Sequence, residues 1–224
     1  MRTETNAFPS TFTGAPEPSS VSGGRFELGL GAGAFWEGIE AMGGPVRTPG
    51  ESVEALEEAI QVIRLMWSGE RAVSFEGRFY RIKGVHPGPP PAHDIGIWLG
   101  AYRPRMLRLT GRLADGWIPS FGRTGVDVLR DGQRRVDEAA EQAGRDPSDV
   151  LRLVNVGGAI ADEVGTTEAR PGQSSGGIAG PPSFWHELLG GLREIGFEGF
   201  VFWPSEPTAE QVERFAREVA PAVR

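Results

Sequence analysis

The sequence predicts an α/β fold in which helices lie outside a parallel sheet. Short apolar segments alternate with longer segments of helical period, and this pair recurs five times along the 224 residues. Residues 95–100 are apolar without alternation, as in a parallel strand covered on both faces. Such a repeat gives either a doubly wound sheet or a (β/α)8 barrel, and the pattern leaves both open.

The predicted strands are short and most of them end in turns. The first covers residues 25–30, where Phe26, Leu28 and Leu30 alternate and a glycine-rich turn follows. The other predicted strands cover residues 95–100, 117–120, 151–160 and 198–203. Residues 72–82 are expected to form a hairpin that turns at Glu76 and Gly77, outside the repeat.

The predicted helices have recognisable starts and stops. Thr48 and Glu51 have the spacing of a capping box, with Pro49 at the first helical position, and Gly69 ends that helix. The remaining helices are expected over residues 105–114, 126–143 and 184–195, and from 208 to a limit set by Pro221. The glycine- and serine-rich residues 172–180 are expected to form a long loop.

Composition restricts the partners and the location. Residues 1–22 have no apolar period and are expected to be a disordered leader, and residues 23–224 are expected to form one domain. The net charge of −7 and the lack of Lys/Arg runs argue against nucleic acid or a membrane as partner, so a small molecule is expected. With no cysteine and no metal-ligand spacing among the three histidines, we expect no metal site. A cytoplasmic location is expected, because neither a signal peptide nor a spanning segment is recognisable.

The glycine-rich turn raises a first candidate function. Residues 29–34 match the G-x-G-x-x-A pattern of a Rossmann dinucleotide site. That site also needs an acidic residue at the end of a second strand, and the acid at that distance, Glu51, lies in the first turn of a helix where it serves as a cap. The Rossmann hypothesis is therefore the weaker alternative.

Several motifs occur in a fixed order along the chain and together carry a family resemblance. They occupy residues 24–33, 48–51, 95–100, 104–107, 109–117 and 199–204. In this order they resemble the luciferase-like monooxygenase superfamily, especially its deazaflavin-dependent branch. The resemblance implies a (β/α)8 barrel of the TIM type, of which this chain would carry about five of the eight βα units, without the N-terminal ones.

The resemblance also implies a cofactor across the carboxyl ends of the strands, with the deazaflavin F420 favoured over FMN. The cofactor-facing loop maps onto Gly31, Ala32 and Gly33, followed by Glu37. The phosphate loop maps onto Tyr102, Arg103, Pro104, Arg105 and Met106 at a helix start, where free N–H groups favour an anion. Trp36, Ser120 and Trp203 are candidate substrate-binding residues. Ordinary structural roles remain alternatives, with Glu37 a solvated helix residue and Tyr102 or the tryptophans packing residues.

The implied activity is hydride transfer to a small organic substrate, or its oxygenation. No catalytic side chain is assigned, because in this family the cofactor performs the chemistry. Sugar-phosphate dehydrogenases of the family carry a carboxylic acid where this chain has Ala34. A barrel of five units leaves two unpaired strand edges, so two alternatives stay open. They are a truncated, catalytically inactive cofactor-binding chain, and a subunit whose barrel is completed by a homo-oligomer or a partner chain.

Overall fold

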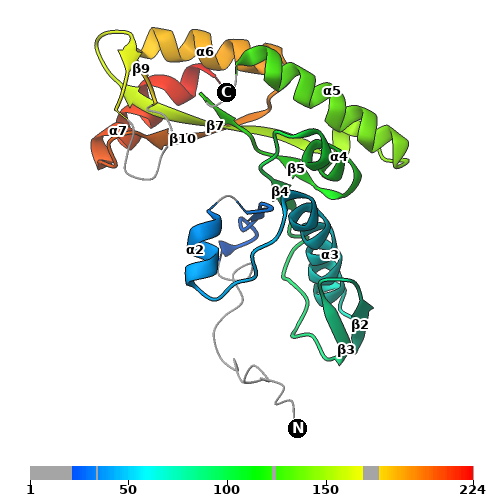
Figure 1. The fold of residues 1–224 in the computed structure, drawn as a ribbon. Coiled ribbons are helices and arrows are strands. Elements are labelled where there is room, and N and C mark those ends of the chain that lie inside the picture. Colours follow the sequence, from blue (N-terminus) through cyan, green and yellow to red (C-terminus); the bar gives the residue numbers. More distant parts are fainter. Residues whose placement is uncertain (1–21, 34, 123–124, 169–176, 224) are drawn as a thin grey trace.

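The structure, a computed structural model, describes residues 22–33, 35–122, 125–168 and 177–223. All but Ser22 of the predicted leader, residues 1–22, lies outside the described residues, so its disorder stays a prediction. The described residues form an open, mostly parallel sheet, helices packed against it, and a separate two-stranded hairpin (Figure 1).

The parallel strands follow the order of the chain. β1 (Leu28–Leu30) pairs with β4 (Ile97–Leu99), β4 with β5 (Gly116–Trp117), β5 with β7 (Leu151–Ile160), and β7 with β10 (Gly199–Pro204). A doubly wound sheet reverses its strand order at a switch point, whereas a barrel keeps the chain order. The strand order is therefore that of an incomplete barrel, which the sequence pattern by itself left undecided.

Three shorter strands extend this sheet along β7. β6 (Ser120–Phe121) pairs with the middle of β7, beyond the level of β5. β9 (Ile178–Gly180) pairs in parallel with the end of β7, and β8 (Gly165–Thr166) pairs antiparallel with β9. The last residues of the predicted loop 172–180 thus form a strand, and residues 172–176 lie outside the described part of the chain.

The predicted helices are confirmed within two residues at their starts. They are α3 (Pro49–Trp67), α4 (Pro104–Leu113), α5 (Val126–Gln142), α6 (Pro182–Glu194) and α7 (Ala209–Arg214), which continues as a π-helical turn (Phe215–Val219) and a 3-10 turn (Ala220–Ala222). The capping box at the start of α3 is present, since the Thr48 hydroxyl accepts from the Glu51 N–H and the Glu51 carboxylate accepts from the Thr48 N–H. The sequence analysis considered Glu37 a helix residue but gave no range for α2 (Trp36–Ala41), and it did not predict the 3-10 turn Pro147–Asp149.

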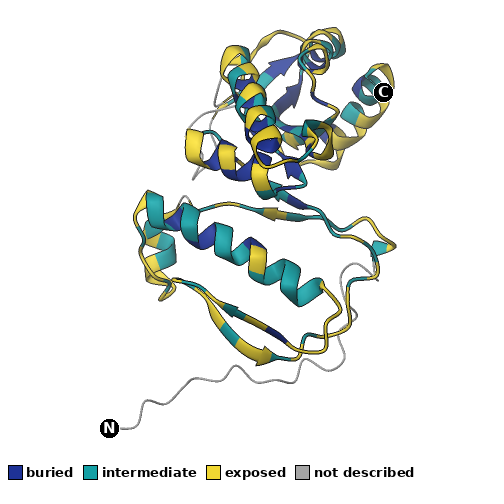
Figure 2. Cartoon of the chain, turned by 90° about the vertical axis from the view of Figure 1, so that its right-hand side faces the viewer, coloured by how far each residue is buried: buried dark blue, intermediate teal, exposed yellow. Residues whose placement is uncertain are grey.

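The two faces of the sheet differ in cover. Ile97, Leu99, Val154 and Val156 are buried on the side of the helices, where α5 and α6 run over the same side of β7 (Figure 1). Figure 2 shows the buried residues concentrated around these strands, with few in α2 or the hairpin. The alternate strand residues, half-buried or exposed, point to the other side, which we call the open face: Trp98, Leu151, Leu153, Asn155, Val201 and Trp203.

The hairpin is confirmed as an excursion from the repeat. β2 (Val73–Glu76) and β3 (Arg81–Val85) form a sheet of their own. One carboxylate fastens its turn to α3, because Glu58 accepts hydrogen bonds of 2.8 to 2.9 Å from the backbone N–H groups of residues 78–80. Desolvation acts to raise the pKa of Glu58, but these three hydrogen bonds and the charge of Arg78 outweigh it and hold the pKa below its ordinary 4.5.

We expect Glu58→Gln to release the hairpin turn from α3. The amide has one acceptor oxygen, and its N–H groups oppose the three backbone donors. Hydrogen exchange at residues 78–80 should become about tenfold faster. Because a lowered pKa stabilises the docked turn above pH 4.5, the wild type should lose this protection as the pH falls through the folded-state pKa.

Glu57→Gln is the matched control for the hairpin experiment. Glu57 is the preceding residue of α3 and pairs with Arg112 rather than with the turn. Equal exchange at residues 78–80 in both variants would show that the Glu58 carboxylate does not hold the turn.

Candidate functional site

Four residues from separate segments are linked near the carboxyl ends of the strands, and we call them the edge cluster: Tyr102, Ser120, Asn155 and Trp203. The Tyr102 hydroxyl oxygen accepts from the Ser120 N–H at 2.7 Å. Ser120 and Asn155 are register partners in β6 and β7, and the Asn155 Oδ1 accepts from the Trp203 Nε1–H at 3.1 Å. Three of these residues were site candidates from the sequence; Asn155 was not.

The register of the sheet places the edge cluster on the open face. Trp203 follows Val201 on the same side of β10, and its register partner in β7 is Gly157. A Cβ atom added to Gly157 would meet only the Trp203 carbonyl oxygen, at 3.8 Å, so the space in front of β7 is open there. Trp203 is itself 57% exposed. A planar molecule therefore has room to lie against its indole ring.

The edge cluster offers mainly hydrogen-bond donors. Because the Tyr102 oxygen already accepts a hydrogen bond, its O–H proton is available to a further acceptor. The Ser120 hydroxyl has no hydrogen-bond partner among the described residues. No charged side chain takes part in the contacts within the cluster. The arrangement suits an uncharged ligand that is rich in acceptor oxygens.

The predicted phosphate loop lies beside the edge cluster, at the start of α4. Arg103 is the N-cap residue in an extended conformation, and Pro104 begins the helix. Arg105 turns away to α3, where its Nη2 lies 3.1 Å from the Glu54 carboxylate. In the described part of the chain Arg103 has no hydrogen bond or ion pair through its side chain, and Met106 is buried. Arg103 is thus the cation that remains available to an anion here.

The predicted cofactor-facing loop lies elsewhere. Gly31, Ala32, Gly33 and Trp36 line a cavity of about 290 Å³, whose other walls come from α3 and from Ile39, Pro45, Arg47 and Tyr80. Gly33 has a φ of +98°, and an added Cβ would lie 2.9 Å from the Trp36 ring, so this turn requires glycine. Glu37 is exposed in the first turn of α2 and does not line the cavity. The structure therefore divides the predicted site residues into two groups.

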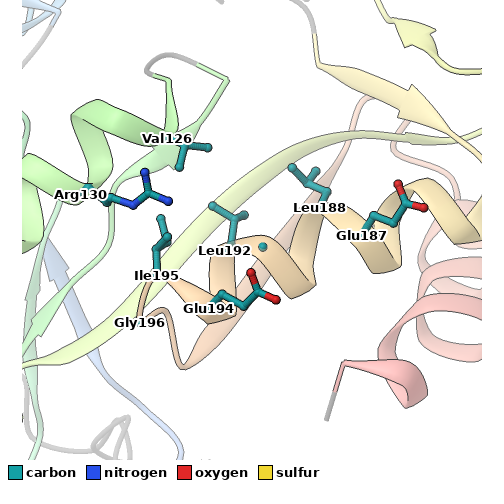
Figure 3. Close-up of a pocket in the computed structure, with 9 residues that line it drawn as sticks. Val126, Arg130, Glu187, Leu188, Leu192, Glu194, Ile195 and Gly196 are labelled. Carbon is teal, nitrogen blue, oxygen red and sulfur yellow. The ribbon is translucent and has the colours of Figure 1, made fainter.

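The largest cleft among those described lies on the helical side of the sheet rather than on the open face. It measures about 770 Å³ and runs between α5 and α6. Figure 3 shows its apolar floor, with Leu188, Leu192 and Ile195, and its charged margins, with Arg130 and Glu194. Because none of its lining residues belongs to a strand or to the edge cluster, we do not assign the candidate site to it.

Two of the three histidines contact backbone carbonyl groups. The His93 Nε2 lies 2.9 Å from the Phe26 carbonyl oxygen, and the His186 Nε2 lies 2.9 Å from that of Glu218. Within the described residues no three side chains of a metal-binding type gather at one place. None of the helices described is both long and apolar enough to cross a bilayer.

Comparison with curated proteins gives partial matches. The chain is 33% identical over 137 residues to the F420-dependent glucose-6-phosphate dehydrogenase of Microbacterium testaceum. This match covers 59% of this chain and 39% of that protein. It is 38% identical over 130 residues to the phthiodiolone/phenolphthiodiolone dimycocerosates ketoreductase of Mycobacterium tuberculosis, covering 57% of this chain and 33% of that protein. The chain thus spans about two fifths or less of the length of these relatives.

Solved structures share the fold. An F420-dependent secondary alcohol dehydrogenase in complex with an F420-acetone adduct matches with a TM-score of 0.77 at 15% identity, over 92% of this chain and 72% of the other. The F420-dependent tetrahydromethanopterin reductase of Methanopyrus kandleri matches with a TM-score of 0.71 at 17% identity, over 91% of this chain and 76% of the other. The sequence profile of luciferase-like monooxygenases matches residues 19–169, so the chain belongs to the luciferase-like monooxygenase family.

Proposed function

We propose that the chain is part of an oxidoreductase that binds a flavin-type cofactor, F420 in preference to FMN, at the carboxyl ends of its strands and acts on a small organic substrate. The observation that carries the proposal is the edge cluster, which gathers three of the candidate site residues, Tyr102, Ser120 and the exposed Trp203. The names of the two relatives and of the two solved structures, all F420 or reductase enzymes, support the same class.

The residues at this edge fit the proposed cofactor in three respects. A flavin-type ring carries carbonyl groups, and the hydroxyl groups of Tyr102 and Ser120 can donate to them. Glycines at positions 29 and 157 leave the open face clear, since a Cβ at Gly29 would meet nothing within 4 Å. Arg103 at the start of α4 would hold the phosphate. When bound, the cofactor would supply the hydride or the reaction with oxygen.

The chain's own residues would bind and orient the reactants. Trp203 would cover one face of the ring or substrate, and Ser120 and Tyr102 would fix its polar edge. The apolar cavity at Gly31, Gly33 and Trp36 is proposed as a second contact region, separate from the edge cluster. Ala34 offers no carboxyl group at the position where the sugar-phosphate dehydrogenases carry one, so we propose a substrate other than a sugar phosphate.

Arg103 and Arg105 provide a matched test of the phosphate site. We expect Arg103→Gln to raise the dissociation constant of F420 about tenfold, because a charge-assisted contact to phosphate is lost. Arg105→Gln should change it less than about threefold, because Glu54 already neutralises that guanidinium. Fluorescence titration of F420 and FMN measures both constants. Equal losses in the two variants, or no saturable binding by the wild type, would contradict the proposal.

A second proposal concerns the partner. In the described part of the chain, β1 pairs with β4 alone and β10 pairs with β7 alone. Both outer edges of the barrel-type sheet are therefore open. Open edges attract further strands. We propose that a second polypeptide segment, from another copy or another chain, closes the barrel. The mass of the purified chain in solution tests the homo-oligomer, and a monomer would count against it.

A further inference from the structure

The Asn155 carboxamide has an orientation that Trp203 fixes. An indole Nε1–H can only donate, so the atom that lies 3.1 Å from it must be an acceptor, the Oδ1 of Asn155. The Nδ2 group, with its two N–H donors, therefore points away from the indole nitrogen. The side chain presents donors in a known direction rather than an amide of either orientation.

The surroundings of Asn155 leave these donors without a partner in the described part of the chain. Its register partners are Ser120 in β6 and Val201 in β10, and its neighbours on the same side of β7 are Leu153 and Gly157. No hydrogen bond from the Nδ2 to a described residue is present. Leu153, Gly157 and Val201 offer no side-chain acceptor, so a half-buried amide donor here costs free energy unless water or a ligand satisfies it.

We infer that Asn155 is a further binding residue of the edge cluster, whose Nδ2 donates to a carbonyl oxygen of the bound molecule. This inference rests on the proposed function and adds to it a residue and a chemical group. The oxygen lies beside the Trp203 indole, within reach of the Ser120 hydroxyl on the neighbouring strand. A cationic or amine-bearing group does not suit this position, because the cluster offers it donors.

The carbonyl can belong to the cofactor ring or to a ketone substrate, and two binding measurements distinguish these sources. The first is titration of the full chain with F420 and with FMN. The second follows the Asn155 side-chain amide, and in the variants the neighbouring Trp203 indole N–H, in ¹H–¹⁵N spectra while acetone, a simple carbonyl probe, is added. A cofactor carbonyl predicts an effect in the first measurement, and a substrate carbonyl predicts one in the second.

Two variants separate the donor from the scaffold. Asn155→Asp keeps an oxygen for the Trp203 N–H but has no N–H to donate. Asn155→Leu has a similar size and no charge, which controls for repulsion by the new carboxylate. We expect each variant to raise the dissociation constant of the affected ligand about tenfold. Without ligand, the Trp203 indole N–H should remain hydrogen-bonded in Asn155→Asp, which its ¹H–¹⁵N signal reports.

The outcomes distinguish this inference from the proposed function. If the wild type binds a cofactor or acetone and both variants bind it equally well, the assignment of Asn155 is wrong and the proposed function stands. If the wild type binds neither cofactor and acetone leaves the Asn155 amide unmoved, both are wrong. Loss in Asn155→Asp without loss in Asn155→Leu would indicate repulsion only, and would also overturn the assignment.

Discussion

Trp185→Ala is expected to remove a large part of the stability of the fold. Trp185 lies in the first turn of α6 and is completely buried. Its ring meets Phe202 and Phe215 edge-on at centroid distances of 5.4 and 6.3 Å, and its Nε1–H lies 3.2 and 3.1 Å from the carbonyl oxygens of Ala159 and Gly180. This one side chain therefore joins α6 to β7, β9, β10 and the turn after α7.

The expected loss follows from the cavity and the freed carbonyl groups. Truncating a fully buried tryptophan costs about 4 kcal/mol, and a domain is stable by only about 5–15 kcal/mol in total. Urea denaturation, followed by circular dichroism, measures the change. Trp185→Phe should lose less, because it keeps most of the ring contacts and removes only the N–H donor.

Trp203→Ala is the control for the Trp185 experiment. Trp203 is 57% exposed on the open face, and its truncation creates no cavity. We expect a loss of less than about 1 kcal/mol. If the two alanine variants were equally unstable, the helical side of the sheet would not be the core on which the fold depends.

Gly111→Ala is expected to destabilise the protein, although alanine favours helices. Gly111 lies in α4 where α5 crosses it, and an added Cβ would lie 2.3 Å from the Val136 carbonyl oxygen and 2.9 Å from the Ala140 nitrogen. Both are backbone atoms that no side-chain rotation can move. The two helices must separate, so we expect a net loss of about 2 kcal/mol after the gain in helix propensity is subtracted.

Gly190→Ala is expected to have the opposite sign. Gly190 also lies inside a helix, α6, but a Cβ added there meets no atom within 4 Å. The gain in helix propensity should then raise the stability by up to about 1 kcal/mol. Thermal denaturation of the two variants measures both changes, and a loss of stability in Gly190→Ala or a gain in Gly111→Ala would contradict the packing described here.

The main helices and strands of the repeat, and the family of the chain, follow from the sequence alone. The helix starts at Pro49 and at Pro104, with the capping pair of Thr48 and Glu51, depend on residues a few positions apart, which the chain brings together locally. The apolar run in β4 likewise predicts a parallel strand. The sequence also indicated Tyr102, Ser120 and Trp203 as site candidates.

How these elements and candidates combine depends on contacts that form in the folded chain. The strand order distinguishes the barrel from the doubly wound sheet, and it arises from pairing between segments that are distant in the sequence. The Trp203 hydrogen bond to Asn155 spans 48 positions, and the Arg105 ion pair with Glu54 spans 51. Such contacts depend on strand register and helix packing, which periodicity and local capping do not specify. For that reason the folded structure was needed to recognise Asn155 as a residue of the edge cluster. It was also needed to show that Arg105 is paired with Glu54, whereas Arg103 is not paired among the described residues.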